Sequence, residues 1–269
     1  MTMATTTIPG LQAMKAAGHK SVCFVAWDYQ MALIADRVGP EIISVGDSVG
    51  VNLWGHTTPL EITMDELLVS AKAVRRGVRG ALLSVDFPFG VLQSGTSVAV
   101  AAAIRLVKEA GADLVKLDGA ADYPEVVEEV TRAGIPVFAQ FGITPQTSLK
   151  YGIDYSTAST ARVPDEMLDE LVGEARRLES AGAVALNFTN SGPVVGPAVV
   201  AAVDIPVLGG FGGGPWLDGR IRMVTAAIGY AAKGVDNAPD TYANVAKVVF
   251  DALTECADDT RSARALRGQ

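Results

Sequence analysis

Hydrophobic residues along the chain form short continuous runs separated by longer amphipathic stretches. Continuous runs rich in β-branched residues are typical of strands that are buried on both faces. The amphipathic stretches predict helices, and a glycine at the start of most runs fits the end of the preceding helix. Strands are predicted within 21–28, 38–48, 78–90, 110–120, 133–142, 181–190 and 203–214, a weak eighth within 220–227, and helices at 65–76, 97–110, 123–133, 164–181 and 241–257.

Alternating strands and helices predict a parallel sheet and the α/β fold class. We expect a single (β/α)8 TIM-type barrel over about residues 20–234, within one domain of residues 1–269. Residues 1–19 would form an N-terminal helix or extension, and residues 236–269 a C-terminal helical tail. An open doubly wound sheet is the alternative, but no G-x-G-x-x-G motif follows the first predicted strand.

Composition narrows the class of protein. Of 269 residues, 49% are hydrophobic and 19% are charged, which excludes a disordered chain. The net charge of −8 argues against nucleic acid or an anionic membrane as the main partner. Cys23 and Cys256 lie far apart, and the first residues lack the basic and apolar regions of a secretory signal. We therefore expect a cytoplasmic enzyme without disulfide bonds and without a membrane span.

Polar residues end several of the predicted strands. In a parallel barrel these ends meet at one mouth, where functional groups gather. Three aspartates from consecutive strands repel one another unless a cation is present, and they predict an all-oxygen site for Mg²⁺. Lys116, on the same strand face as Asp118, would neutralise an anionic substrate. The candidates are Asp28, Asp47, Ser48, Asp86, Lys116, Asp118, Gln140, Asn187 and the loop 209–214.

Each candidate also has a purely structural interpretation. A single aspartate after a strand is more often the N-cap of the next helix than a ligand. The glycine-rich loop 209–214 is either an anion cradle or a flexible connection. His19 and His56 have no ligand spacing around them, so a zinc site and a Ser-His-Asp arrangement are not expected.

Six ordered blocks of the sequence resemble the signature blocks of the ketopantoate hydroxymethyltransferase (3-methyl-2-oxobutanoate hydroxymethyltransferase) family, whose barrel is of the phosphoenolpyruvate mutase/isocitrate lyase type. The resemblance covers about residues 20–255. The blocks are VGDSVG (45–50), PLEITMDEL (59–67), VDFPFG (85–90), AGADLVKLDG (110–119), GIPVFAQFGITPQ (134–146) and GGGPWLDGR (212–220).

The resemblance implies a Mg²⁺-dependent homodecamer that transfers a hydroxymethyl group from 5,10-methylenetetrahydrofolate to 3-methyl-2-oxobutanoate through a metal-stabilised enolate. It implies Asp47 and Asp86 as metal ligands, Asp118 as an outer carboxylate, and Ser48 and Lys116 as substrate contacts. With Asp47 and Asp86 these contacts form the expected substrate-binding set, and the small-molecule partners would be an oxo acid and folate.

The chain departs from the family pattern at two positions. Gln140 stands where the family has His, and Asn187 stands where it has the Glu that is its presumed base. An amide does not accept a proton at neutral pH, so Asn187 would remove general-base catalysis worth about 10²–10⁴-fold. We list Lys116, Asp118, Gln140 and Asn187 as candidate catalytic residues.

These departures leave several hypotheses open. The missing base would be replaced by Asp118, by a metal-bound hydroxide or by neutral Lys116. Alternatively, the substrate would be more acidic than a simple 2-oxo acid. Alternatively, the enzyme is a carbon–carbon lyase or aldolase of a specialised pathway. An inactive relative that binds an oxo acid or supports an oligomer is a third possibility, and the retained aspartates and lysine argue against it.

Overall fold

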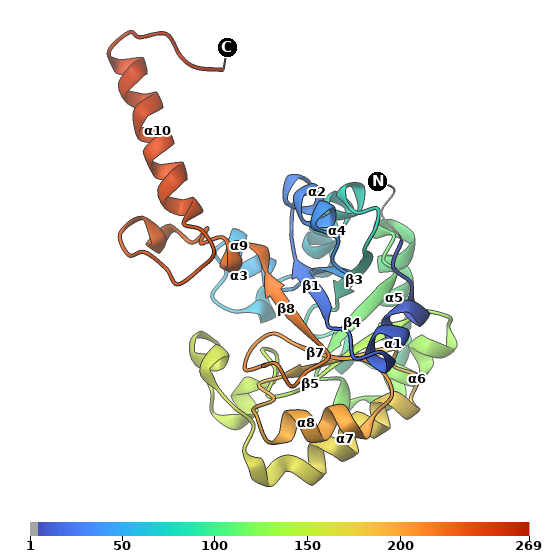
Figure 1. Cartoon of the computed structure of the whole chain (residues 1–269). Helices are drawn as coiled ribbons and strands as arrows, with labels where there is room; N and C mark the ends of the chain where they lie inside the picture. Colours follow the sequence, from blue (N-terminus) through green and yellow to red (C-terminus); the bar gives the residue numbers. More distant parts are fainter. Residues whose placement is uncertain (1–4, 269) are drawn as a thin grey trace. The chain divides into compact units, whose positions relative to one another are not determined.

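The computed structural model describes residues 5–268 and contains a closed barrel of eight strands in chain order (Figure 1). Every strand pair from β1–β2 through β7–β8 is parallel. The predicted α/β barrel is therefore confirmed. The strands are β1 (Ser21–Val25), β2 (Ile42–Val45), β3 (Leu82–Asp86), β4 (Leu114–Asp118), β5 (Val137–Gly142), β6 (Ala185–Thr189), β7 (Val207–Gly209) and β8 (Gly219–Met223).

Helices link successive strands from β1 to β7 on the outside of the barrel, whereas residues 210–218 join β7 to β8 without a helix. Their starts follow local signals: in α4, Thr63 and Glu66 form a reciprocal capping box. The predicted helices coincide with α4, α5, α6, α7 and α10 to within a few residues. The α-helices are α1 (Ile8–Ala16), α2 (Tyr29–Val38), α3 (Val49–Leu53), α4 (Met64–Gly77), α5 (Thr96–Ala110), α6 (Pro124–Arg132), α7 (Leu168–Ser180), α8 (Val195–Ala202), α9 (Val224–Ala227) and α10 (Val245–Arg261).

The amino-terminal end of the barrel interior is closed by an apolar layer. One buried residue from each of β1 to β7 joins a single cluster, and Ile221 of β8 packs against it. Leu11 of α1 belongs to the same cluster and covers this end. The members are Leu11, Cys23, Ile42, Leu82, Leu114, Phe138, Ala185 and Leu208. Their burial leaves the opposite end of the barrel as the place for polar chemistry.

Polar side chains replace this apolar layer one step further along the strands. Side chains two positions apart share a face of a strand. The residues two positions after the layer on β2 to β6 are therefore directed into the barrel, and all five are buried: Ser44, Ser84, Lys116, Gln140 and Asn187. A barrel interior of this composition is unusual for a purely structural core, because buried polar groups need partners.

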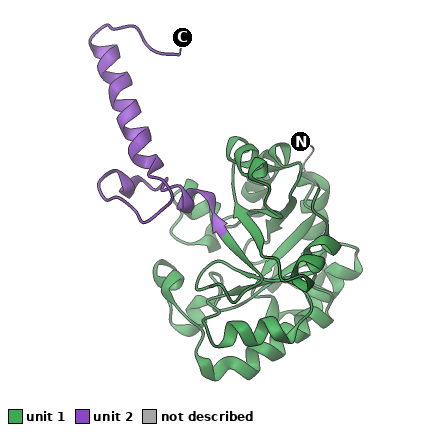
Figure 2. Cartoon of the chain, viewed as in Figure 1, with its two compact units in different colours: residues 1–221 green, residues 222–269 purple. Residues whose placement is uncertain are grey.

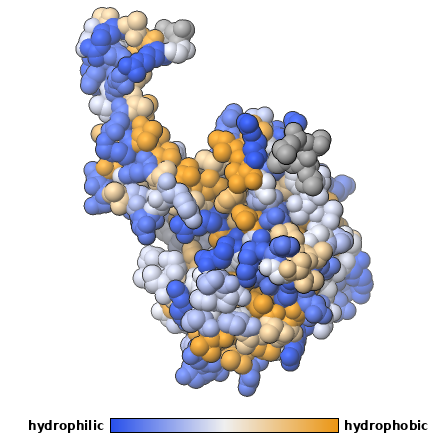
Figure 3. Space-filling view, viewed as in Figure 1, coloured by the Kyte–Doolittle hydropathy of each residue, from blue (hydrophilic) through white to orange (hydrophobic). Residues whose placement is uncertain are grey.

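The chain divides into two compact units, residues 1–221 and 222–269 (Figure 2). Residues 1–4 and 269, at the ends of the expected extension and tail, lie outside the described residues. In the second unit, Asn244 caps α10 by accepting a hydrogen bond from the Lys247 amide. Apolar side chains of α10 are exposed, among them Val248, Phe250 and Leu253 (Figure 3). Within residues 5–268, no helix is long and apolar enough to cross a membrane.

Candidate active site

An ion pair lies inside the carboxyl-terminal mouth of the barrel. Asp86 ends β3 and is the register partner of Lys116 on β4. The Lys116 Nζ lies 2.7 Å from the Asp86 Oδ2, and the two side chains are only 10% and 4% exposed. Ser44 donates a longer hydrogen bond of 3.4 Å to the other oxygen of Asp86. Because the two groups are buried together, each charge is stabilised by the other rather than by water.

Asp47 lies beside this pair, directly after β2. Its backbone amide donates to the Asp86 carboxylate, and the Ser48 amide donates to Asp47 itself. The close approach depends on Gly46, where a Cβ would lie 2.9 Å from the Ser48 Oγ and 3.5 Å from the Asp86 Oδ2. The Gln146 Nε2 donates to the Asp47 Oδ2 over 2.8 Å and to the Phe87 carbonyl over 3.1 Å. Gln146 thereby joins the loops that follow β2, β3 and β5.

The buried carboxylates hold their protons more tightly than free ones do. Burial, reinforced by the Asp86 carboxylate, raises the pKa of Asp47 to about 7. Burial, with the Asp47 charge, raises the pKa of Asp118 to about 8, although Thr144 donates a hydrogen bond to it. Burial also raises the pKa of Asp86 against the opposing effect of Lys116. Burial disfavours charged Lys116, but Asp86 and Asp47 outweigh it and raise the pKa of Lys116. The site thus contains more carboxyl groups than its one lysine can balance as charged groups.

A second set of polar residues continues around the mouth in strict register. Asp118 pairs with Gln140, and Gln140 pairs with Asn187, across β4, β5 and β6. All three residues are at most 5% exposed. The Gln140 Nε2 donates to the Thr189 Oγ over 3.0 Å. One oxygen on each member, Asp118 Oδ1, Gln140 Oε1 and Asn187 Oδ1, is buried without a hydrogen-bond partner.

Loop residues that the sequence analysis did not single out complete the mouth. Asn190 is fully buried in a left-handed conformation with φ of 59°. Its Nδ2 donates to the carbonyls of Ile143 and Ala158, and its amide donates to the Phe211 carbonyl. Asn190 therefore ties together the loops after β5, β6 and β7. Gln146 is the last residue of the block GIPVFAQFGITPQ (134–146), and this block is the one sequence signal that pointed to it.

The donor set fits a hard divalent cation. Asp47 and Asp86 are adjacent buried carboxylates, and Asp118 offers an oxygen without a partner. Oxygen ligands of this kind are those that Mg²⁺ prefers. Among the described residues, however, no three His, Cys, Asp or Glu side chains are grouped closely enough to hold one ion. The three-aspartate metal site stays a prediction.

Other candidates have structural roles. Asp28 caps α2 by accepting a hydrogen bond from the Met31 amide over 2.9 Å. In the loop 209–214, Arg220 donates to the carbonyls of Gly210 and Gly213, and a Cβ on Gly214 would collide with Trp216. Close packing thus accounts for Gly214, and a left-handed φ of +61° accounts for Gly212. A zinc site at His56 would need further metal-binding side chains grouped with it, and residues 5–268 contain no such group.

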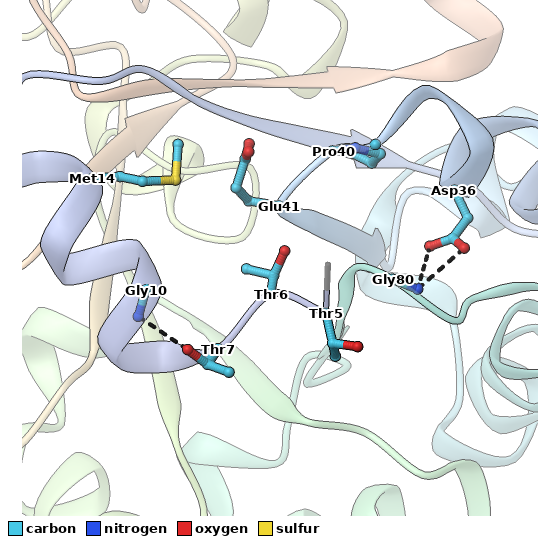
Figure 4. Close-up of a pocket in the computed structure, with 10 residues that line it drawn as sticks. Thr5, Thr6, Thr7, Gly10, Met14, Asp36, Pro40, Glu41 and Gly80 are labelled. Atoms are coloured by element: carbon cyan, nitrogen blue, oxygen red, sulfur yellow. Dashed lines mark hydrogen bonds between the residues drawn. The ribbon is translucent and has the colours of Figure 1, made fainter. Parts of the chain in front are cut away.

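A pocket of about 340 Å³ lies at the opposite end of the strands (Figure 4). Its lining includes Thr5, Thr6, Met14 and Glu41. Asp36 also lines it, but both carboxylate oxygens of Asp36 accept backbone hydrogen bonds from residues 79–81. Residues 39–41 and 80 precede β2 and β3, so this pocket is separate from the polar mouth.

Solved structures with the same fold were found. Phosphonopyruvate hydrolase matches with a TM-score of 0.60 and 16% identity, over 98% of this chain and 90% of that one. The 2,3-dimethylmalate lyase, a member of the PEP mutase/isocitrate lyase superfamily, matches with a TM-score of 0.59 and 13% identity, over 96% and 99%. At these identities the likeness concerns the fold alone.

Buried carboxylates and a lysine at the carboxyl-terminal mouth of a closed barrel define an enzyme of the (β/α)8 class. The family model described as ketopantoate hydroxymethyltransferase matches residues 5–264. The 3-methyl-2-oxobutanoate hydroxymethyltransferases of Salinibacter ruber and Moorella thermoacetica are 35% and 34% identical, each over 96% of this chain and over 96% and 94% of their own lengths. This chain belongs to the ketopantoate hydroxymethyltransferase family and is a transferase.

Proposed function

We propose that this enzyme transfers a hydroxymethyl group from 5,10-methylenetetrahydrofolate to C3 of 3-methyl-2-oxobutanoate or a related enolisable 2-oxo acid. The relatives named above carry 3-methyl-2-oxobutanoate in their names. The observation that carries the proposal for this chain is the buried Lys116–Asp86 pair beside Asp47. This arrangement offers one fixed ammonium group, that of Lys116, and two carboxylates at a single place in the mouth.

The residues divide the work of binding an oxo acid. Lys116 would contact the substrate carboxylate through its buried ammonium group. Ser48 follows Asp47 directly before α3 and is half-buried, and it would contact the substrate. Asp47 and Asp86 would hold Mg²⁺, which supplies positive charge that favours ionisation at C3. Gln146 keeps Asp47 in position through its 2.8 Å hydrogen bond.

Asp118 is the residue that we propose as the proton acceptor for C3. It lies on β4, two positions after Lys116, and its Oδ1 has no hydrogen-bond partner. Asn187 lies on β6, two strands away from β4 and level with Asp118 in the strand register. Its amide is not a base. The proton removed from C3 would therefore pass to Asp118 rather than to the β6 position.

A carbon–carbon lyase or aldolase is the second candidate, and Asn187 is the observation that favours it. Cleavage of a carbon–carbon bond generates the same carbanion without removing a C3 proton, so a neutral amide on β6 is no obstacle. The two candidates differ in folate use. The transferase needs 5,10-methylenetetrahydrofolate for turnover, whereas the lyase turns over a substituted oxo acid without it.

The deciding experiment is deuterium exchange at C3 of 3-methyl-2-oxobutanoate in D₂O, followed by NMR, with Mg²⁺ and without folate. Transferase chemistry predicts exchange above the buffer rate that is lost when Mg²⁺ is chelated. An Asp118→Asn variant should lose exchange while still binding the oxo acid. If wild-type enzyme binds Mg²⁺ and shows no exchange, the transferase proposal is wrong for this substrate.

The family resemblance also leads us to propose a homo-oligomer, with a decamer as the expected form. The exposed apolar side chains Val249, Phe250 and Leu253 share one face of α10 and support an oligomer, because a contiguous apolar face is seldom left in water without function. Light scattering after size-exclusion chromatography measures the mass directly. A particle of one 28.0 kDa chain would contradict the proposal.

A further inference from the structure

Asn190 occupies an unusual buried position directly after β6. It is fully buried, and its φ of 59° is left-handed. Among residues 5–268, Ala263 is the only other non-glycine residue with a positive φ. The loop after β7 comes so close that a Cβ on Gly212 would lie 2.6 Å from the Asn190 Cα. Backbone conformation and crowding alone would favour glycine at position 190, so its side chain needs a reason of its own.

The Asn190 carboxamide holds the loop between β5 and α7. Its Nδ2 donates to the carbonyl oxygens of Ile143 and Ala158, each over 3.0 Å. The backbone carbonyl of Asn190 also accepts from the Val163 amide over 2.9 Å, and this bond does not need the side chain. Asn190 therefore holds the loop at three points, two of which depend on its carboxamide.

The first residues of this loop carry two side chains that reach the buried carboxylates. Thr144 is fully buried, and its hydroxyl donates a hydrogen bond to Asp118. Gln146 donates from its Nε2 to the Asp47 Oδ2 over 2.8 Å. Residues 143–146, the β5 clamp, therefore connect the carboxamide that holds them to both carboxylates.

The chemistry of asparagine suits this position. Of the small residues that tolerate a left-handed φ, it alone donates two hydrogen bonds from its side chain. Glycine has no donor, and an aspartate would direct a carboxylate at two carbonyl oxygens. The Asn190 Oδ1 is buried without a partner, which is unfavourable, so packing does not explain the residue. Its two donated hydrogen bonds do.

We infer that Asn190 is a positioning residue of the active site, which fixes the β5 clamp and, through it, the carboxylates of Asp47 and Asp118. The inference deepens the proposed function and rests on it for the roles of these two carboxylates. The hydrogen bonds of Asn190 described above all go to loop backbone, so its effect on the carboxylates passes through the clamp. Removal of a group that orients a metal ligand in this way typically weakens metal binding by about 10–100-fold.

Asn190→Gly is the informative variant, because glycine keeps the left-handed backbone and its hydrogen bonds and removes only the carboxamide. Hydrogen–deuterium exchange of the full-length protein without metal, followed by mass spectrometry, measures the effect on each loop. Exchange should become about tenfold faster in peptides over residues 143–158 and also over residues 45–50, which contain Asp47. Faster exchange confined to residues 143–158 would overturn the inference, because Asn190 would then hold one loop without affecting Asp47.

Titration with Mg²⁺ tests the same connection at the carboxylates. Calorimetry of Asn190→Gly should give a Kd for Mg²⁺ about tenfold above that of the wild type. Gln146→Met removes the donor to Asp47 with little change in side-chain length and should have a similar effect. Because both residues act through one clamp, the double variant should lose clearly less affinity than the product of the two single losses. A double variant that loses the full product would contradict the inference.

Asn244→Gly is the matched control. The Asn244 Nδ2 also donates to a backbone carbonyl, that of Gly234, over 2.8 Å, but Asn244 belongs to the unit of residues 222–269. This variant loses a carboxamide of the same kind. It should keep the wild-type Kd for Mg²⁺ and the wild-type hydrogen exchange in both loops.

These measurements separate the inference from the proposed function. If Asn190→Gly changes neither the Kd for Mg²⁺ nor residues 45–50, and the wild type catalyses C3 exchange, the transferase proposal stands and the role of Asn190 is wrong. If both loops respond to Asn190→Gly but the wild type catalyses no C3 exchange, the positioning role is correct and the transfer chemistry is not. If the wild type binds no Mg²⁺, the metal part of the proposed function fails, and the hydrogen exchange of residues 45–50 alone decides the inference.

Discussion

Lys116 and Asp86 are register partners on β4 and β3, and their charged atoms lie 2.7 Å apart in the barrel mouth. Removing one partner of a buried ion pair leaves an uncompensated charge, typically at a loss of about 3–5 kcal/mol. Asp86→Asn should therefore lower the free energy of unfolding by about 3 kcal/mol or more in urea titrations. Lys116→Met in the same chain should recover part of this loss. Strictly additive single and double variants would show that the two charges do not interact.

Removal of the Asp86 carboxylate should also abolish Mg²⁺ binding, because only Asp47 and the outer carboxylate of Asp118 would be left as ligands and the charge of Lys116 would no longer be paired. Calorimetric titration of Asp86→Ala with Mg²⁺ measures this loss, and circular dichroism shows whether the barrel is retained. Asp28→Ala is the control, since Asp28 also follows a strand but only caps α2. Unchanged Mg²⁺ affinity in a folded Asp86→Ala protein would remove Asp86 from the ligand set.

Gly142 ends β5 with φ of +87°, and a Cβ there would lie 2.6 Å from the Thr189 carbonyl oxygen. Gly134 has nearly the same φ of +85°, but nothing lies within 4 Å of its Cβ position. Alanine variants at the two positions therefore separate the effect of backbone strain on stability from the effect of a steric collision. Gly134→Ala should destabilise the fold by about 1–2 kcal/mol, the typical loss for a left-handed residue. Gly142→Ala should lose clearly more, and equal losses would mean that β6 moves aside freely.

Much of the fold follows from the sequence, because barrel strands buried on both faces leave continuous apolar runs. The weakest prediction was the eighth strand, and β8 (GRIRM) alternates apolar residues with two exposed arginines, so it lacks a continuous run. Asp47, Asp86, Lys116, Asp118, Gln140 and Asn187 were found because the chain direction places strand ends at one mouth.

Register and loop contacts did not follow from the sequence. The pairing of Asp118 with Gln140 depends on the stagger of the strands around the closed barrel. Gln146 is 99 positions from Asp47, and only the folded loop after β5 brings their side chains together. Asp28 was a candidate site residue that caps a helix instead. A helix N-cap and a ligand at a strand end have the same local sequence, so the sequence alone does not separate them.

Glu174 on α7 should make the folded protein less stable as the pH rises. Burial, with the nearby Glu170 carboxylate, raises the pKa of Glu174 from 4.5 to about 7. The folded state thus binds this proton more tightly than the unfolded state. The loss of stability caused by the ionised carboxylate is therefore absent below pH 4.5 and complete above pH 7. Glu174→Gln should gain about 1–2 kcal/mol at pH 8 and nothing at pH 4.5, after allowance for screening.

Urea titrations at the two pH values test this difference. The exposed Glu166 provides the control, because Glu166→Gln removes the same charge without removing a buried carboxylate. An equal gain for Glu174→Gln at both pH values would show that the effect comes from packing rather than from the proton.

Asn187→Glu tests which residue can serve as the base. A carboxylate at position 187 would lie in register with Gln140 and two strands from Asp118, the proposed base. In an Asp118→Asn background, which lacks the proposed base, it should increase the C3 exchange rate of 3-methyl-2-oxobutanoate about 10²-fold or more, the usual contribution of a positioned base. Asn187→Gln, which extends the side chain equally but stays neutral, is the control and should not increase exchange. A folded Asp118→Asn/Asn187→Glu enzyme that does not regain exchange would mean that position 187 does not face C3.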